Sequence, residues 1–196
     1  MPVMPDALQA ARWLLAKERP YLSAALWALV PVATEACMAP VIRREWFLPP
    51  EERPQDPAGT EDPVVWVPTM SVDRWWRLYF HPQVADIYSV DELARMLYHE
   101  LSHVLRDHAS RALELRAQPL VANVAQDIAI NQDLREDGDF APPHSLLPEY
   151  FRLPSGLTWE AYYDILQKRL PEKSPKGNGL PFSFPGTSSG SPSGSS

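Results

Sequence analysis

The pattern of apolar and polar residues predicts a mainly helical chain with short strands near its middle. Residues 6–30 show helical periodicity that breaks just before Pro20. Two helices are therefore expected, because proline is tolerated at the start of a helix and not in its interior. The apolar run 21–33 is too short to cross a bilayer, and we interpret it as a buried helix.

Two runs in the middle of the chain are typical of β-strands. Residues 64–70 and 74–80 are rich in β-branched and aromatic side chains, and a turn at Val72-Asp73 would join them as a hairpin. Pro68 makes the first run an edge strand or a partly irregular one. These strands between helices predict an α+β fold.

The strongest helical signal covers residues 89–105. Ser89 and Glu92 form the pattern S-x-x-E of a capping box, and the apolar residues that follow share one helix face. Two further helices are expected at about 116–135 and after Thr158.

Composition limits the class of protein. Hydrophobic residues make up 45% of the 196 residues, enough for one core. We predict one domain over residues 1–172, with an exposed, proline-rich acidic loop at 49–63 and a disordered Ser/Gly/Pro-rich tail at 173–196. The net charge of −7 favours neither nucleic-acid nor membrane binding. Cys37 is the one cysteine and no signal peptide is recognised, so a reducing, cytoplasmic location is expected.

Three of the five histidines lie in the stretch MLYHELSHVLRDH, residues 96–108. His99, Glu100 and His103 form the pattern H-E-x-x-H. Residues four apart lie on one helix face, so both imidazoles can point at one metal ion, with Glu100 beside them. A zinc ion lowers the pKa of its bound water to about 7, and a nearby carboxylate can take the proton. The alternative is a solvated helix whose histidines match this pattern by chance. Since the helix is predicted independently, the pattern favours a zinc hydrolase with Glu100 as its catalytic base.

Two imidazoles do not complete a zinc site, and His108 is the candidate third ligand nearest in sequence. It lies about 140° away from His103 around an unbroken helix. It could reach the ion only if the helix ended near Arg106-Asp107, and no glycine marks such an end. An interaction of His108 with free carbonyls at the helix C-terminus is the alternative.

The second helix offers a polar stripe at Asn123, Asp127 and Asn131, which is costly to bury without partners. Asp127 is the preferred third ligand, because a carboxylate suits zinc better than an amide. Its alternative role is to accept a hydrogen bond from the far nitrogen of a ligating histidine. Asn123 and Asn131 would then form hydrogen bonds between helices.

Four blocks in order, RLYFHP, DELARMLYHELSHVLRDHASRA, NVAQDIAINQDL and GLTWEAYYDIL, resemble a family of largely uncharacterised bacterial metallopeptidase domains. Members often precede a von Willebrand factor A-like domain. The resemblance covers about residues 65–170 and implies a zincin-like fold, with a small β-element over an active-site helix and a second helix that completes the site. In the broader gluzincin group the second helix reads E-x-x-x-D, with the glutamate as ligand. Here Asn123 takes that place and Asp127 matches the aspartate, which leaves the third ligand open among Asp127, His108 and Asn123.

Two functions follow as hypotheses. The first is a zinc-dependent peptidase, in which residues 77–80 either pair with an extended substrate or only cover the core. The second is an inactive metallopeptidase-like module that binds protein partners. The resemblance points to a MoxR-type AAA ATPase or a von Willebrand A-like protein as that partner.

Overall fold

The computed structural model describes residues 4–40, 47–52 and 66–169. Helices dominate this part of the chain and the strands are short, so the predicted α+β, mainly helical class is confirmed. The elements in chain order are α1 (Asp6–Glu18), η1 (Pro20–Leu22), α2 (Ser23–Ala28), β1 (Val30–Ala33), β2 (Met38–Pro40), η3 (Pro50–Glu52), β3 (Trp66–Pro68), β4 (Met70–Val72), β5 (Arg77–Phe80), α3 (Val84–Ile87), α4 (Val90–Leu105), α5 (His108–Glu114), α6 (Pro119–Glu136), η4 (Pro148–Phe151) and α7 (Trp159–Arg169).

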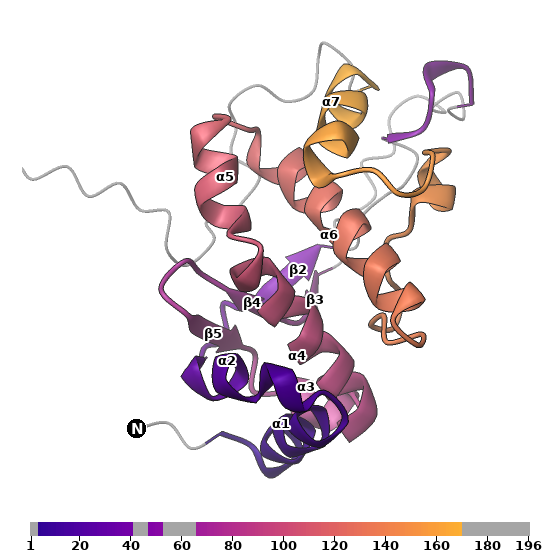
Figure 1. The fold of residues 1–196 in the computed structure, drawn as a ribbon. Coiled ribbons are helices and arrows are strands. Elements are labelled where there is room, and N and C mark those ends of the chain that lie inside the picture. The colour runs from indigo at the N-terminus through magenta and orange to yellow at the C-terminus, as the bar shows by residue number, and fades with distance from the viewer. Residues whose placement is uncertain (1–3, 41–46, 53–65, 170–196) are drawn as a thin grey trace, which may run out of the picture.

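The elements form two groups, each around its own hydrophobic cluster. In Figure 1, α1 to α4 lie in the lower part, and α5, α6 and α7 lie above them. The first cluster joins α1, α2, α4, β4 and β5 through buried apolar residues, including Leu15, Met70, Leu78 and Leu97. The second joins α6 and α7 through residues such as Ile128 and Tyr162. Helices α4 and α6 contact each other where the two groups meet, and we call this contact the α4–α6 interface.

The strands form two small sheets, and β4 of the first contacts α4. The first has the order β1-β5-β4, in which β1 runs parallel to β5 and β4 runs antiparallel to it. The second consists of β2 and β3, paired antiparallel. β5 is therefore the central strand of its sheet, and β4 is paired on one side only within the described part of the chain.

Helix α4 begins as its sequence predicts. The Ser89 hydroxyl accepts a hydrogen bond from the Glu92 backbone N–H at 3.3 Å, and the Glu92 carboxylate accepts one from the Ser89 backbone N–H at 2.8 Å. Leu93, Leu97 and Leu101, which share one face of the helix, are fully buried. The cap fixes where α4 begins. The leucine stripe fixes which face of the helix turns away from the core.

The helical predictions for residues 6–30, 116–135 and the segment after Thr158 correspond to α1 and α2, α6, and α7. The interpretation of residues 21–33 as one buried helix is wrong in two respects: Leu26 is the one buried residue of α2, and the helix ends at Ala28. Val30 precedes Pro31, and a residue before proline is steered towards extended backbone. The chain leaves the helix after Ala28, and β1 pairs with β5.

The predicted hairpin exists, but its first strand is β4 and not residues 64–70. The chain changes partner at Thr69, whose N–H donates to the Cys37 carbonyl and whose carbonyl accepts from the His81 N–H. As a result β3 pairs with β2 and β4 pairs with β5. Asp73 closes the turn, since its carboxylate accepts hydrogen bonds from the backbone N–H groups of Trp75 and Arg77.

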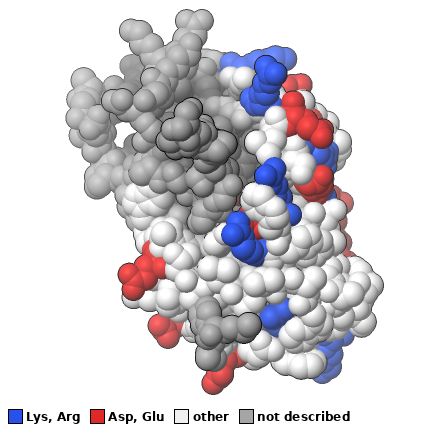
Figure 2. Space-filling model, turned by 90° about the vertical axis from the view of Figure 1, so that its left-hand side faces the viewer, with Lys and Arg blue, Asp and Glu red and all other residues white. Residues whose placement is uncertain are grey.

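Most of the predicted acidic loop and the whole predicted tail lie outside the described residues. At the start of that loop, Pro50–Glu52 forms η3 and is exposed. Every helix in the described ranges is too short or too polar to cross a membrane. The face seen in Figure 2 carries charged side chains of both signs, and its lower part is mostly uncharged.

Replacing Ser89 with Ala removes the acceptor for the Glu92 N–H. We expect the free energy of unfolding to fall by about 1 kcal/mol, as for other N-cap serines. Urea denaturation followed by circular dichroism measures this change. Ser155→Ala, at an exposed serine outside any helix, is the control and should leave stability nearly unchanged. An equal loss in both variants would contradict the capping role.

Cys37 is buried, with its Sγ atom 3.6 Å from the Ser71 hydroxyl. Burial raises the pKa of the thiol from 9.0 to about 11. Since the thiolate is the reactive form, we expect iodoacetamide to modify Cys37 of the folded protein at pH 7.5 at least about 100-fold more slowly than in 8 M urea. Mass spectrometry of quenched samples gives both rates, and equal rates would show that this thiol is accessible.

Candidate metal centre

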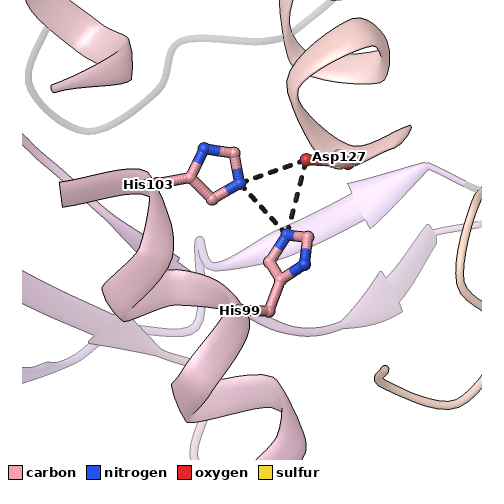
Figure 3. A group of neighbouring side chains, drawn as sticks. All are labelled: His99, His103 and Asp127. Carbon is pink, nitrogen blue, oxygen red and sulfur yellow. Dashed lines mark hydrogen bonds and ion pairs between the residues drawn. The ribbon is translucent and has the colours of Figure 1, made fainter. Parts of the chain in front are cut away.

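The α4–α6 interface brings together three side chains that the sequence singled out. His99 and His103 project from successive turns of α4, and Asp127 faces them from α6 (Figure 3). The two imidazole Nε2 atoms lie 3.1 Å apart. The Asp127 Oδ1 atom lies 3.4 Å from His99 Nε2 and 3.2 Å from His103 Nε2. Among the described residues these three form a group that could hold a metal ion.

The triangle of donor atoms fits a small tetrahedral ion. Zinc binds imidazole nitrogen and carboxylate oxygen at about 2.0–2.2 Å, so two ligands of a tetrahedral zinc lie about 3.3–3.5 Å apart. The three observed separations, 3.1, 3.2 and 3.4 Å, lie in or just below that range. The side chains retain partial exposure, 12% for His99, 14% for His103 and 20% for Asp127. The donor set is therefore both compact and reachable.

Asn131 orients the first imidazole. Its side-chain oxygen lies 2.8 Å from His99 Nδ1, while its amide nitrogen donates to the Leu146 carbonyl at 3.1 Å. Because the Asn131 oxygen can only accept, His99 Nδ1 must carry a proton. In the neutral imidazole this leaves the lone pair on Nε2, the atom that faces Asp127. The predicted hydrogen bond between helices is thus present at Asn131.

Asn123 lies one turn before Asp127 on the same helix. Its amide nitrogen donates to Asp127 Oδ2 at 3.2 Å, so the oxygen that does not face the histidines also has a partner. Among the described residues, Asn123 does not form the expected bond to another helix, and its amide donates within α6 instead. Asp127 Oδ1 is left to face the two imidazoles.

The three groups perturb one another electrostatically. Burial alone would disfavour the ionised form of Asp127, but hydrogen bonds from His103 and His99 outweigh burial and lower its pKa. Burial also opposes protonation of His99, yet the hydrogen bond and charge of Asp127 outweigh it and raise the pKa of this imidazole. At His103 burial dominates, helped by the charge of His99, and its pKa is lowered. The carboxylate thus stays ionised at neutral pH.

Glu100 follows His99 directly and is partly buried. Burial raises its pKa to about 8, against the opposing effects of His99 and of a hydrogen bond from the Val72 backbone on β4. A carboxyl group with such a pKa can gain and lose a proton near neutral pH, which general acid–base catalysis requires.

The helix end near Arg106-Asp107 that His108 would need to turn back towards His103 is present. Helix α4 ends at Leu105, and Asp107 adopts left-handed backbone with φ 50° and ψ 42° before α5 begins. His108 is consequently buried, with its Nδ1 atom 3.2 Å from His103 Nδ1. It faces the far nitrogen of His103 and not free carbonyls at the end of α4. The available signal was Asp107 itself, since aspartate tolerates left-handed backbone more readily than most residues.

The structure also changes which strand could meet a substrate. Residues 77–80 form β5, which has a neighbour on both sides, so this strand cannot pair with an incoming peptide. Within the described part of the chain β1 and β4 are the two edge strands of this sheet, and β4 contacts α4. The one-sided pairing and the hydrogen bond from Val72 to Glu100 both place β4 beside the candidate centre.

Comparison with known proteins identifies one family. A family model with the description "Putative metallopeptidase domain" matches residues 61–190. No curated protein and no solved structure matches the chain.

Proposed function

The chain belongs to this family of metallopeptidase domains, and we propose that it is a zinc-dependent peptidase. One observation carries the proposal: two imidazole nitrogens and one carboxylate oxygen converge beside Glu100 with the spacing of tetrahedral zinc ligands. His99, His103 and Asp127 would hold the ion, and Glu100 is the proposed catalytic base.

The composition of the centre favours zinc in a catalytic role. Calcium and magnesium prefer sites made of oxygen ligands, whereas two of these three donors are nitrogen. Structural zinc sites have four protein ligands, whereas catalytic sites have three and keep one position open. When bound, zinc would polarise the substrate carbonyl and lower the pKa of a water molecule. Among the described residues the group has three such ligands, which supports a hydrolytic function.

The residues of the chain supply the proton transfers. Glu100 can take a proton from the attacking water and pass it to the leaving amine nitrogen as the peptide bond breaks. Asn131 keeps the proton of His99 on Nδ1, so Nε2 remains free to donate its lone pair. Asn123 holds the second oxygen of Asp127 and thereby limits rotation of the carboxylate.

The edge strand β4 supports an extended peptide as the class of substrate. An extended peptide that added to β4 would be bound through its main chain and would lie next to Glu100. This mode of binding requires little sequence preference. A von Willebrand A-like or AAA ATPase partner remains an implication of the family resemblance, and a cytoplasmic location remains a prediction from the sequence.

We expect the protein, purified without chelator or metal-affinity tag, to contain about one zinc ion per chain. His99→Ala/His103→Ala should lose the ion, because only one of the three ligands remains. Asp127→Ala should bind it more weakly. Inductively coupled plasma mass spectrometry measures the content, with His144→Ala, at an exposed histidine, as the control. Zinc absent from the wild type even after addition of the metal would refute the proposed centre.

Glu100→Gln should retain zinc but lose peptidase activity by about 100- to 10,000-fold, the range that general acid–base groups contribute. Cleavage of fluorescently labelled casein by the zinc-loaded protein measures the rate. Glu114→Gln, at an exposed glutamate on α5, is the matched control and should stay fully active. Unchanged activity of Glu100→Gln would rule out the base. A zinc-loaded wild type without activity on any peptide would favour the alternative, an inactive partner-binding module.

A further inference from the structure

His103 has a contact on the side of its ring that faces away from Asp127. Its Nδ1 atom lies 3.2 Å from the Nδ1 atom of His108, and the two rings meet edge to face with centroids 5.1 Å apart. A hydrogen bond between these two imidazole nitrogens requires one of them to donate and the other to accept.

The position of His108 is fixed by several independent contacts. The residue is 2% exposed and packs beside the ring of Trp159 on α7, with ring centroids 6.0 Å apart. Its backbone carbonyl accepts a hydrogen bond from the Gln126 side chain on α6 at 3.3 Å. The left-handed backbone at Asp107 turns the chain so that His108 begins α5 instead of continuing α4. Three helices therefore hold this imidazole against His103.

The direction of the hydrogen bond follows from the role of His103. If His103 Nε2 donates its lone pair to a metal ion, the proton of the neutral ring must be on Nδ1. His108 Nδ1 must then accept that proton, and the proton of His108 itself must be on Nε2.

His108 also lines a cleft of about 290 Å³, which Arg106, Gln132 and Trp159 line as well.

The two ligating imidazoles are thereby held in the same way by different residues. Asn131 on α6 accepts from His99 Nδ1, and His108 on α5 can accept from His103 Nδ1. Acceptors at the far nitrogen of a ligating histidine fix its tautomer and ring orientation, and they raise its basicity.

We propose that His108 is a positioning residue that holds His103 in the tautomer and orientation needed for metal binding. This inference rests on the proposed function, since it requires His103 to be a ligand. His108 does not itself bind the ion: the nitrogen that it directs at His103 faces the side of that ring opposite to the Asp127 carboxylate.

Two variants of similar shape separate hydrogen bonding from packing. His108→Asn keeps an acceptor atom bonded to Cγ, as Nδ1 is in histidine, whereas His108→Leu has a methyl group there. We expect His108→Leu to weaken zinc affinity about 10- to 100-fold and His108→Asn to restore most of that loss. Competition with a fluorescent chelator measures the dissociation constants. Visible spectra of the cobalt-substituted proteins report the change in ligand field independently of activity.

Gln132→Leu is the matched control. Gln132 is buried, lines the same cleft and accepts hydrogen bonds from the Gly156 N–H and the Tyr162 hydroxyl. This substitution should lower the thermal stability of the metal-free protein but leave zinc affinity unchanged. Equal losses of zinc affinity in Gln132→Leu and His108→Leu would show that the effect is structural and would overturn the inference.

One measurement uses the wild-type protein and therefore does not depend on whether a variant folds. In the zinc-loaded protein with ¹⁵N-labelled histidine, long-range ¹H–¹⁵N correlation spectra should show His103 protonated on Nδ1 and His108 neutral with its proton on Nε2. A proton on Nδ1 of His108 would overturn the inference. If the wild type binds zinc and His108→Leu binds it equally well, the inference alone fails. If the wild type binds no zinc, the proposed function fails and the inference fails with it.

Discussion

The α4–α6 interface is arranged around one requirement: the negative charge of the partly buried Asp127 carboxylate must be compensated. A negative charge that loses contact with water must be compensated by nearby donors or cations. Two imidazoles from α4 face one of its oxygens, and Asn123 donates to the other. The same compensation can be provided by a cation bound between the two helices. Folding of this interface and formation of a metal centre therefore require the same arrangement of side chains.

The polar residues of α6 are explained by this constraint. The helix is buried over most of its surface, and its apolar side chains pack against α7 in the second cluster. Asn123, Asp127 and Asn131 recur every four residues and so form one line along the helix. Within this line the central carboxylate faces the histidines. Asn131 extends the contact to His99, while Asn123 supports Asp127 within the helix. An apolar stripe at these positions would leave His99 Nδ1 without its acceptor and would remove the carboxylate that faces the two Nε2 atoms.

The parts of the centre set by periodicity could be predicted from the sequence. The capping box, the leucine stripe of α4 and the line of polar residues on α6 each follow from helix geometry, and they determine which faces meet. Contacts that depend on a break in regular structure could not be predicted. His108 reaches His103 because of one left-handed residue, Asp107, and no glycine marks that turn. The exchange of strand partners at Thr69 likewise depends on pairing with β2, a three-residue strand too short to show a pattern.

The candidate centre lies between two hydrophobic clusters, so a bound ion would affect how strongly the two clusters are held together. His99 and His103 belong to the helix of one cluster, and Asp127 belongs to the helix of the other. An ion bound by all three stabilises only the arrangement in which the clusters are docked. By mass action this stabilisation reaches about 2.7 kcal/mol when free ion exceeds the dissociation constant 100-fold. The supply of metal would then set how firmly the two parts are joined as well as whether the centre is complete. Chelation would loosen the boundary between them before either cluster melted.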